Sequence, residues 1–169
     1  TAKHNADSTE DLITQINVSI GDAKTLLGEG AAKVENAAET LASQLRDVIS
    51  IEGLKKQSST LDQEATIEKI VKRTAETTEM VVGVYFRINP ELTPYLTQED
   101  GVHGAFYADE KKDGVFTAQE AVKLKEFNKD NPYMTWYYNA LTQRNGVWSD
   151  VYFDPYSNIE TISYSYPIY

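Results

Sequence analysis

The chain has 169 residues, which fits one domain or one domain with a helical extension. Its net charge of −10, from 26 acidic and 16 basic side chains, argues against binding to nucleic acid or to anionic lipid, because both require a basic surface. It contains no cysteine, which excludes disulfides, thiolate metal sites and thiol nucleophiles.

Aromatic residues are confined to the second half of the chain. Residues 1–84 contain no Phe, Tyr, Trp or Pro, whereas eleven Tyr, five Phe and two Trp follow from Tyr85 onward. The first half can therefore form long helices but lacks large side chains that could enclose a ligand. The second half can form a compact sheet with an aromatic pocket.

Two helices are predicted before residue 80. Residues 7–50 are predicted to form one long helix, because apolar residues recur at spacings of three and four over residues 34–49. A second helix is predicted over residues 60–78. We therefore predict a long N-terminal stalk helix within residues 1–58, followed by a compact module over residues 59–169.

The compact module is predicted to contain strands and short helices. Residues 80–88 are β-branched and aromatic and end at Asn89-Pro90, which predicts a strand buried on both faces. Further strands are predicted over residues 104–108, 147–152 and 159–168, and helices over residues 117–127 and 132–141.

The last strand shows the clearest alternation. Apolar residues at 162, 164 and 166 alternate with serines at 163 and 165, which predicts that one face is exposed to solvent. Tight turns link the strands that follow Gly146, so these strands should pair antiparallel. The predicted fold class is α+β: a small antiparallel sheet packed against helices, after a long N-terminal helix.

The segment over residues 109–120 has part of the pattern of a calcium-binding loop. Acidic residues and an Asp-Gly pair fall at positions 1, 5, 6 and 12 of such a loop. Position 3 is Lys111, whose ammonium group stands where an oxygen ligand belongs. We therefore predict no metal site. In place of a calcium-binding loop, we expect a β-turn over residues 112–114 and a helix capped by Thr117.

Sequence motifs for catalysis are absent. The chain has no Gly-x-Ser-x-Gly, no His-Glu-x-x-His and no phosphate-binding Gly-rich loop. His4 lies near the start of the chain, and His103 lies in a predicted loop without an evident acidic partner. We therefore predict no enzymatic activity and no cofactor.

The densest aromatic stretch runs from Tyr133 to Tyr156. Tyr and Trp combine a large apolar face with a polar tip, which suits a pocket for a small polar molecule, and Asp154 could bind a ligand amine. Aromatic residues also favour ordinary strands, and Asp154-Pro155 is also typical of a turn. From the residues alone, a ligand site and a purely structural cluster both remain open.

Four segments of the chain, taken together and in order, resemble a known family. They are Gly83–Thr93, Trp136–Tyr138, Gly146–Asp154 and Ile162–Tyr169. They resemble the membrane-distal part of double Cache (PAS-like) sensor domains, the extracytoplasmic region of bacterial chemoreceptors, sensor histidine kinases and diguanylate cyclases. The resemblance implies a PAS-like module over residues 59–169, incomplete at its C-terminal end, after a helix that leaves the first membrane span.

The resemblance also implies a ligand site. In amino-acid-sensing members, an Arg-x-Trp-Tyr segment holds the ligand carboxylate, and a Tyr-x-Asp segment follows. The candidate ligand-binding residues here are Trp136, Tyr137, Tyr152, Asp154, Tyr107, Tyr133 and Met134. Met134 stands at the position of the arginine and cannot pair with a carboxylate, so an α-amino acid is not the expected ligand.

The expected function is therefore sensing of a small molecule outside the cytoplasm by a non-catalytic receptor domain. We expect a homodimer that forms through the N-terminal helix, and attachment to the membrane through flanking spans that are not in this chain. The competing hypothesis is a structural or dimerisation module of such a receptor that binds no ligand. Its pocket would be filled by its own Tyr and Phe side chains.

Overall fold

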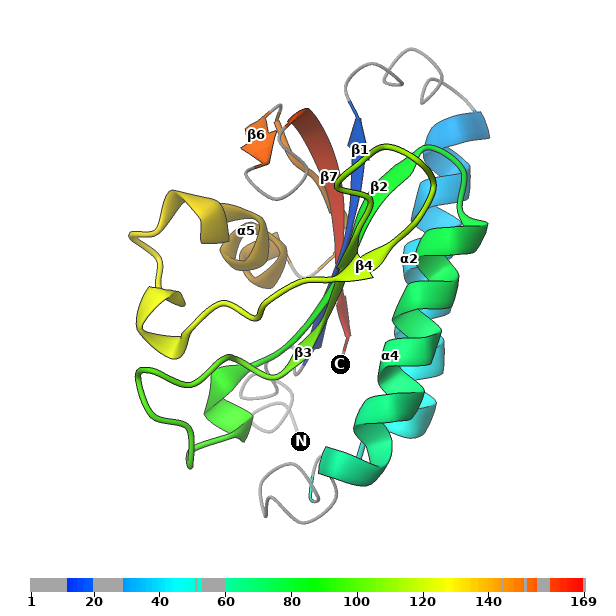
Figure 1. Ribbon diagram of the computed structural model, residues 1–169. Helices are drawn as coiled ribbons and strands as arrows, with labels where there is room; N and C mark the ends of the chain where they lie inside the picture. The colour runs from blue at the N-terminus through cyan, green and yellow to red at the C-terminus, as the bar shows by residue number, and fades with distance from the viewer. Residues whose placement is uncertain are drawn as a thin grey trace.

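The computed structural model describes residues 12–19, 29–50, 52, 60–143, 145–150, 152–154 and 159–168. These residues form three layers: an antiparallel sheet in the middle, two long helices on one face, and a shorter helix with loops on the other (Figure 1). The predicted α+β class, an antiparallel sheet flanked by helices, is confirmed.

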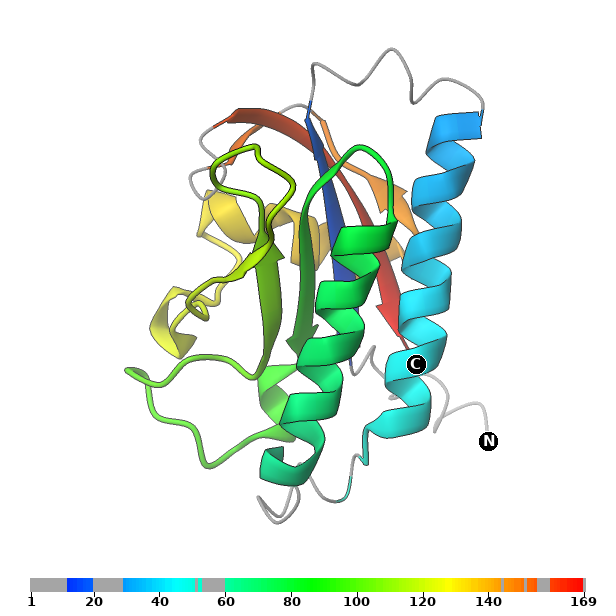
Figure 2. The ribbon, with the colours of Figure 1, turned by 45° about the vertical axis from the view of Figure 1, so that its right-hand side comes forward.

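The strands are β1 (Leu12–Ser19), β2 (Val81–Ile88), β3 (Gly104–Ala108), β4 (Thr117–Ala118), β5 (Val147–Trp148), β6 (Tyr152–Asp154) and β7 (Ile159–Ile168). The α-helices are α2 (Glu29–Val48), α4 (Thr60–Thr77) and α5 (Thr135–Gln143). The 3-10 helices are η2 (Pro90–Leu92), η3 (Leu124–Glu126) and η4 (Pro132–Met134). Figure 2 shows α2 and α4 side by side along the sheet.

The sheet has seven strands in the order β4-β3-β2-β1-β7-β5, and β6 also pairs with β7. All of these pairings are antiparallel. β1 lies near the centre, where Leu12 is opposite Ile88 of β2 on one side and Ile168 of β7 on the other. The first described segment of the chain therefore joins strands from the middle and the end of the sequence.

The continuous helix predicted over residues 7–50 is wrong for residues 12–19, which form β1. This segment has β-branched residues at 13, 14, 16 and 18, which favour extended backbone. Pairing with β2 and β7 satisfies its backbone groups along both edges. The helical prediction is confirmed for α2.

The predicted stalk within residues 1–58 is therefore not one helix, since it contains β1 as well as α2. The proposed boundary between residues 58 and 59 lies outside the described residues. Ile16 of β1 and Leu41 of α2 are both fully buried in one cluster with Val71 of α4. Residues on both sides of the proposed boundary thus contribute to the same core.

Most elements of the second half are confirmed. The predicted helix over residues 60–78 is α4, and the predicted strands over residues 80–88 and 104–108 are β2 and β3. The helix predicted to start at Pro132 begins with η4 and continues as α5. The last predicted strand is β7, and the strand predicted before it is divided into β5 and β6.

The helix predicted over residues 117–127 is wrong. Thr117–Ala118 pair with β3 as β4, and the backbone N–H of Gln119 donates to the carbonyl oxygen of Phe106 at 2.8 Å. Helix formation would break these bonds between strands, which complete the sheet edge. Leu124–Glu126 alone form a helical turn, η3, within the described residues of this segment.

Two hydrophobic clusters lie on opposite faces of the sheet. One packs α2 and α4 against the sheet and includes Leu41, Val71 and Phe86. The other packs α5 and loops against the sheet and includes Tyr85 and Tyr137. Tyr85 and Phe86 are neighbours in β2 and point to opposite faces, as successive residues of a strand do. We call the two sides the helix-pair face and the α5 face.

The edge of the sheet at β5 is attached to α2. Trp148 Nε1 donates to Glu35 Oε1 at 2.8 Å, and the rings of Trp148 and Tyr164 lie 5.1 Å apart. Burial raises the pKa of Tyr164 to about 12, with smaller contributions from the nearby charges of Glu35 and Glu39 and from Tyr166. Tyr164 therefore stays neutral between α2 and the sheet over the whole physiological pH range.

Gly104 is expected to tolerate no side chain. Its φ is +156°, and a Cβ there would overlap the carbonyl oxygen of Phe86. Gly104→Ala should lower the free energy of unfolding by about 2–4 kcal/mol, measured by urea denaturation. Gly114→Ala is the control: its φ is +84° but no atom lies within 4 Å of a Cβ, so about 1–2 kcal/mol is expected. Equal losses in the two variants would contradict this assignment.

The Trp148–Glu35 hydrogen bond is expected to stabilise the attachment of α2. Trp148→Phe should lower the free energy of unfolding by about 1.5–3 kcal/mol, because a bond to a carboxylate is lost. A double-mutant cycle with Glu35→Ala should give a coupling of about 1 kcal/mol. The matched cycle with Glu39→Ala, on the same helix, should give a coupling near zero. Similar couplings in both cycles would show that the hydrogen bond is not the source of the effect.

Candidate functional site

The α5 face of β7 is polar and buried. Thr161 and Ser163 are fully buried, and Ser165 is 3% exposed. The prediction that one face of this strand is exposed to solvent is therefore wrong. The residues on that face are buried, and α5 packs against it. On the helix-pair face the same strand contributes Tyr164 to an otherwise mostly aliphatic core. Three buried hydroxyl groups in a row make this face of β7 more polar than the face that packs against the helix pair.

Aromatic packing fills the centre of the α5 layer. Met134 and Tyr137, two of the predicted site residues, are 1% and 2% exposed and belong to one cluster with Phe127. The rings of Phe127 and Tyr137 meet edge to face at 4.6 Å. Tyr138 Oη donates to the carbonyl oxygen of Phe127 at 3.2 Å, and burial raises the pKa of Tyr138. The structure thus brings Met134 and Tyr137 together, as packed core residues.

Tyr107, another predicted site residue, lies on the other side of the sheet. It pairs with Val84 across the β2–β3 ladder and belongs to the cluster on the helix-pair face. Burial raises the pKa of Tyr107, and the carboxylate of Glu68 on α4 raises it further. The sheet therefore separates Tyr107 from Met134 and Tyr137.

The backbone positions of the other four candidates fall into two groups. Tyr133 lies in η4 and Trp136 in the first turn of α5. Tyr152 and Asp154 lie in β6, opposite residues 161 and 159 of β7. The side chains of these four residues lie outside the described part of the structure. Their place in a ligand site stays a prediction.

A buried cation on the α5 face was not predicted as a functional residue. Arg87 is 2% exposed, its guanidinium carbon lies 5.1 Å from the ring centre of Tyr85, and its Nη1 lies 3.3 Å from the carbonyl oxygen of Phe86. The signal in the sequence is a single charge inside the apolar strand over residues 81–88. Arg87 shares its row of the sheet with Pro167 of β7, because both are opposite residue 13 of β1.

The loop between β3 and β4 has no calcium-site geometry. The carboxylate of Asp109 accepts the backbone N–H groups of Asp113 at 3.0 Å and Gly114 at 2.9 Å. Positive φ values of 56° at Lys112 and 84° at Gly114 close the turn over these residues. Asp109 therefore orders its own loop. The described residues include no group of three or more His, Cys, Asp or Glu that could hold a metal ion.

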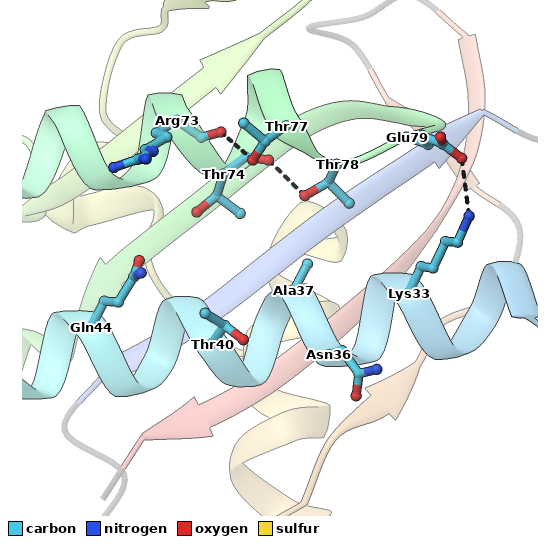
Figure 3. Close-up of a pocket in the computed structure, with 10 residues that line it drawn as sticks. All are labelled: Lys33, Asn36, Ala37, Thr40, Gln44, Arg73, Thr74, Thr77, Thr78 and Glu79. Atoms are coloured by element: carbon cyan, nitrogen blue, oxygen red, sulfur yellow. Dashed lines mark hydrogen bonds and ion pairs between the residues drawn. The ribbon is translucent and has the colours of Figure 1, made fainter.

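A groove of about 480 Å³ lies between α2 and α4 on the outer surface of the helix pair (Figure 3). The hydroxyls of Thr77 and Thr78 donate to carbonyl oxygens of α4 at 2.7 Å, and Lys33 Nζ lies 3.3 Å from Glu79 Oε2. These polar groups are thus bonded within the helix pair. The groove is separated by the helices and the sheet from the α5 face, on which Met134 and Tyr137 pack.

No helix in the described ranges is both long and apolar enough to cross a bilayer.

No curated protein and no solved structure gives a significant match to the chain. A family model described as "Methyl-accepting chemotaxis protein-like, first PDC sensor domain" matches residues 67–169. PDC sensor domains are PAS-like, extracytoplasmic, non-catalytic sensing modules. The match covers the greater part of the chain, and the chain belongs to this family of first PDC sensor domains.

Proposed function

We propose that this chain binds a small polar molecule on the α5 face of its sheet, as the sensing domain of a bacterial transmembrane receptor. The site lies where α5, β6 and β7 meet, and it includes the predicted residues Trp136, Tyr152 and Asp154. One observation carries this proposal: β7 presents a row of buried hydroxyl groups to this layer. Hydroxyl groups can donate hydrogen bonds to a polar ligand and accept them from it, which apolar side chains cannot do.

The contrast between the two faces of the sheet supports a ligand site. The helix-pair face is closed by aliphatic side chains such as Ile16, Val84 and Leu45, all fully buried. The α5 face combines aromatic packing in its centre with hydroxyls along β7 and the cation of Arg87 on β2. A purely structural module has no need for this polarity, because apolar side chains of similar size would cost less to bury.

The aromatic cluster around Tyr137 restricts where the ligand can lie. Met134, Tyr137 and Phe127 already contact one another in the centre of the layer, as the competing structural hypothesis expects. The proposed ligand therefore lies beside this cluster, toward β6, and not within it. Met134 contributes packing to the side of the proposed site. Its thioether carries no charge and makes no ion pair with a ligand carboxylate.

The family supports a role in a receptor at the cell surface or in the periplasm. We propose a periplasmic or cell-surface position in a chemoreceptor, a sensor histidine kinase or a diguanylate cyclase, as the membrane-distal module of a double Cache region. A homodimer through the N-terminal helix stays a prediction. Ligand binding would transmit a signal only if it favours one of two arrangements of the domain through a difference in affinity.

Thermal-shift screening of a metabolite panel, followed by titration calorimetry, tests the proposed site. Asp154→Ala and Trp136→Ala should each weaken binding of an identified ligand about tenfold or more, because each removes a hydrogen bond or an aromatic contact. Asp47→Ala, an exposed position on α2, is the matched control and should leave the dissociation constant unchanged. A ligand that binds equally well to all three variants would place the site elsewhere.

A further inference from the structure

Thr161 stands out among the buried polar groups on the α5 face. It is fully buried, and its Oγ1 has no hydrogen-bond partner among the described residues. In β7 it lies opposite Tyr152 of β6 on one side and Ser19 of β1 on the other. Buried side-chain hydroxyls are nearly always hydrogen-bonded in folded proteins, so a buried hydroxyl without a partner needs a reason.

Ser163, the next residue of β7 on the α5 face, is linked to Ser149 by two hydrogen bonds. The backbone N–H of Ser163 donates to Ser149 Oγ at 2.9 Å, and the backbone N–H of Ser149 donates to the carbonyl oxygen of Ser163 at 2.8 Å. These two bonds fix the segment after β5 against β7. Thr161 lies two residues away, at the part of β7 that pairs with β6. Thr161 therefore lies beside a hydrogen-bonded segment, while its own hydroxyl has no partner among the described residues.

We propose that the Thr161 hydroxyl contacts the ligand of this sensing domain directly, and that the ligand is a small molecule rich in hydroxyl groups, such as a polyol or a sugar. This inference rests on the proposed function and deepens it. Oγ1 can both donate and accept a hydrogen bond, as can a ligand hydroxyl. In the free protein the unmet hydroxyl destabilises the fold, and a bound ligand removes that cost.

Asp154 of the proposed site can accept hydrogen bonds from ligand hydroxyls, and the buried charges of the described residues add no counter-ion at Thr161. The buried charged side chains of the described residues are Arg87 and Asp109. Arg87 lies in the row of Pro167, six residues from Thr161 along β7, a separation of about 20 Å at the rise of a strand. The Asp109 carboxylate is bound by the backbone of its own loop. Neither charge therefore provides a counter-ion for a ligand beside Thr161.

The first test needs no ligand. Thr161→Val keeps the shape of the side chain and removes the hydroxyl, so it should raise the melting temperature of the free 169-residue chain by about 2–4 °C. Thr93→Val is the matched control. Thr93 is also buried, but its Oγ1 donates to the carbonyl oxygen of Pro90 at 3.2 Å, so this variant should melt at a lower temperature. A lower melting temperature for Thr161→Val would show that the hydroxyl has a structural partner and would overturn the proposal.

The second test uses thermal shifts with panels of sugars and polyols, carboxylic acids, and amino acids. The wild-type chain should respond to a sugar or polyol, Thr161→Val should lose that response, and Thr161→Ser should keep part of it. An unchanged response of Thr161→Val, or a response of the wild type to acids or amino acids alone, would overturn the inference while leaving the sensing function intact. No response of the wild type to any panel would contradict the proposed function itself, and the inference with it.

Discussion

The pairing of β1 between β2 and β7 is the interaction on which the rest of the structure depends. It joins the described N-terminal segment to strands from the middle and the end of the sequence, and so makes one continuous sheet. That sheet separates the helix pair from the α5 layer, and each strand contributes alternate residues to both sides. Without β1 the sheet would divide into β2–β3–β4 and β5–β6–β7, and the core on the helix-pair face, which includes Ile16 of β1 and residues of both halves, would be interrupted.

The sequence predicted those elements whose local pattern agrees with their tertiary environment. The strand over residues 81–88 is apolar throughout and is buried on both faces, so composition and position agree. β1 was missed because its apolar residues also fit a helical spacing, and its pairing partners are distant in sequence. The serines of β7 were predicted to be exposed, since alternation shows which residues share a face but not what covers that face. α5 provides the cover, and its packing depends on contacts between distant segments.

The residues of the candidate site could also be predicted only in part, because the sequence does not show which face of the sheet each residue occupies. Trp136, Tyr152 and Asp154 were proposed through resemblance to a family, and the backbone places the last two beside β7. Tyr107 was expected to lie near these residues, but the register of β3 puts it on the helix-pair face. Thr161 gave no signal in the sequence, because a threonine in a strand is ordinary until its burial and its missing partner are known.

A sensing site on the α5 face and a site in the groove between α2 and α4 differ in which amides respond to a ligand. The most direct measurement is amide chemical-shift mapping of the ¹⁵N-labelled chain, titrated with a compound that raises its melting temperature. The largest changes are expected in α5, β6 and residues 159–165 of β7, with smaller changes in α2 and α4. Changes confined to α2 and α4 around the groove, with β6 and β7 unaffected, would contradict a ligand site on the α5 face.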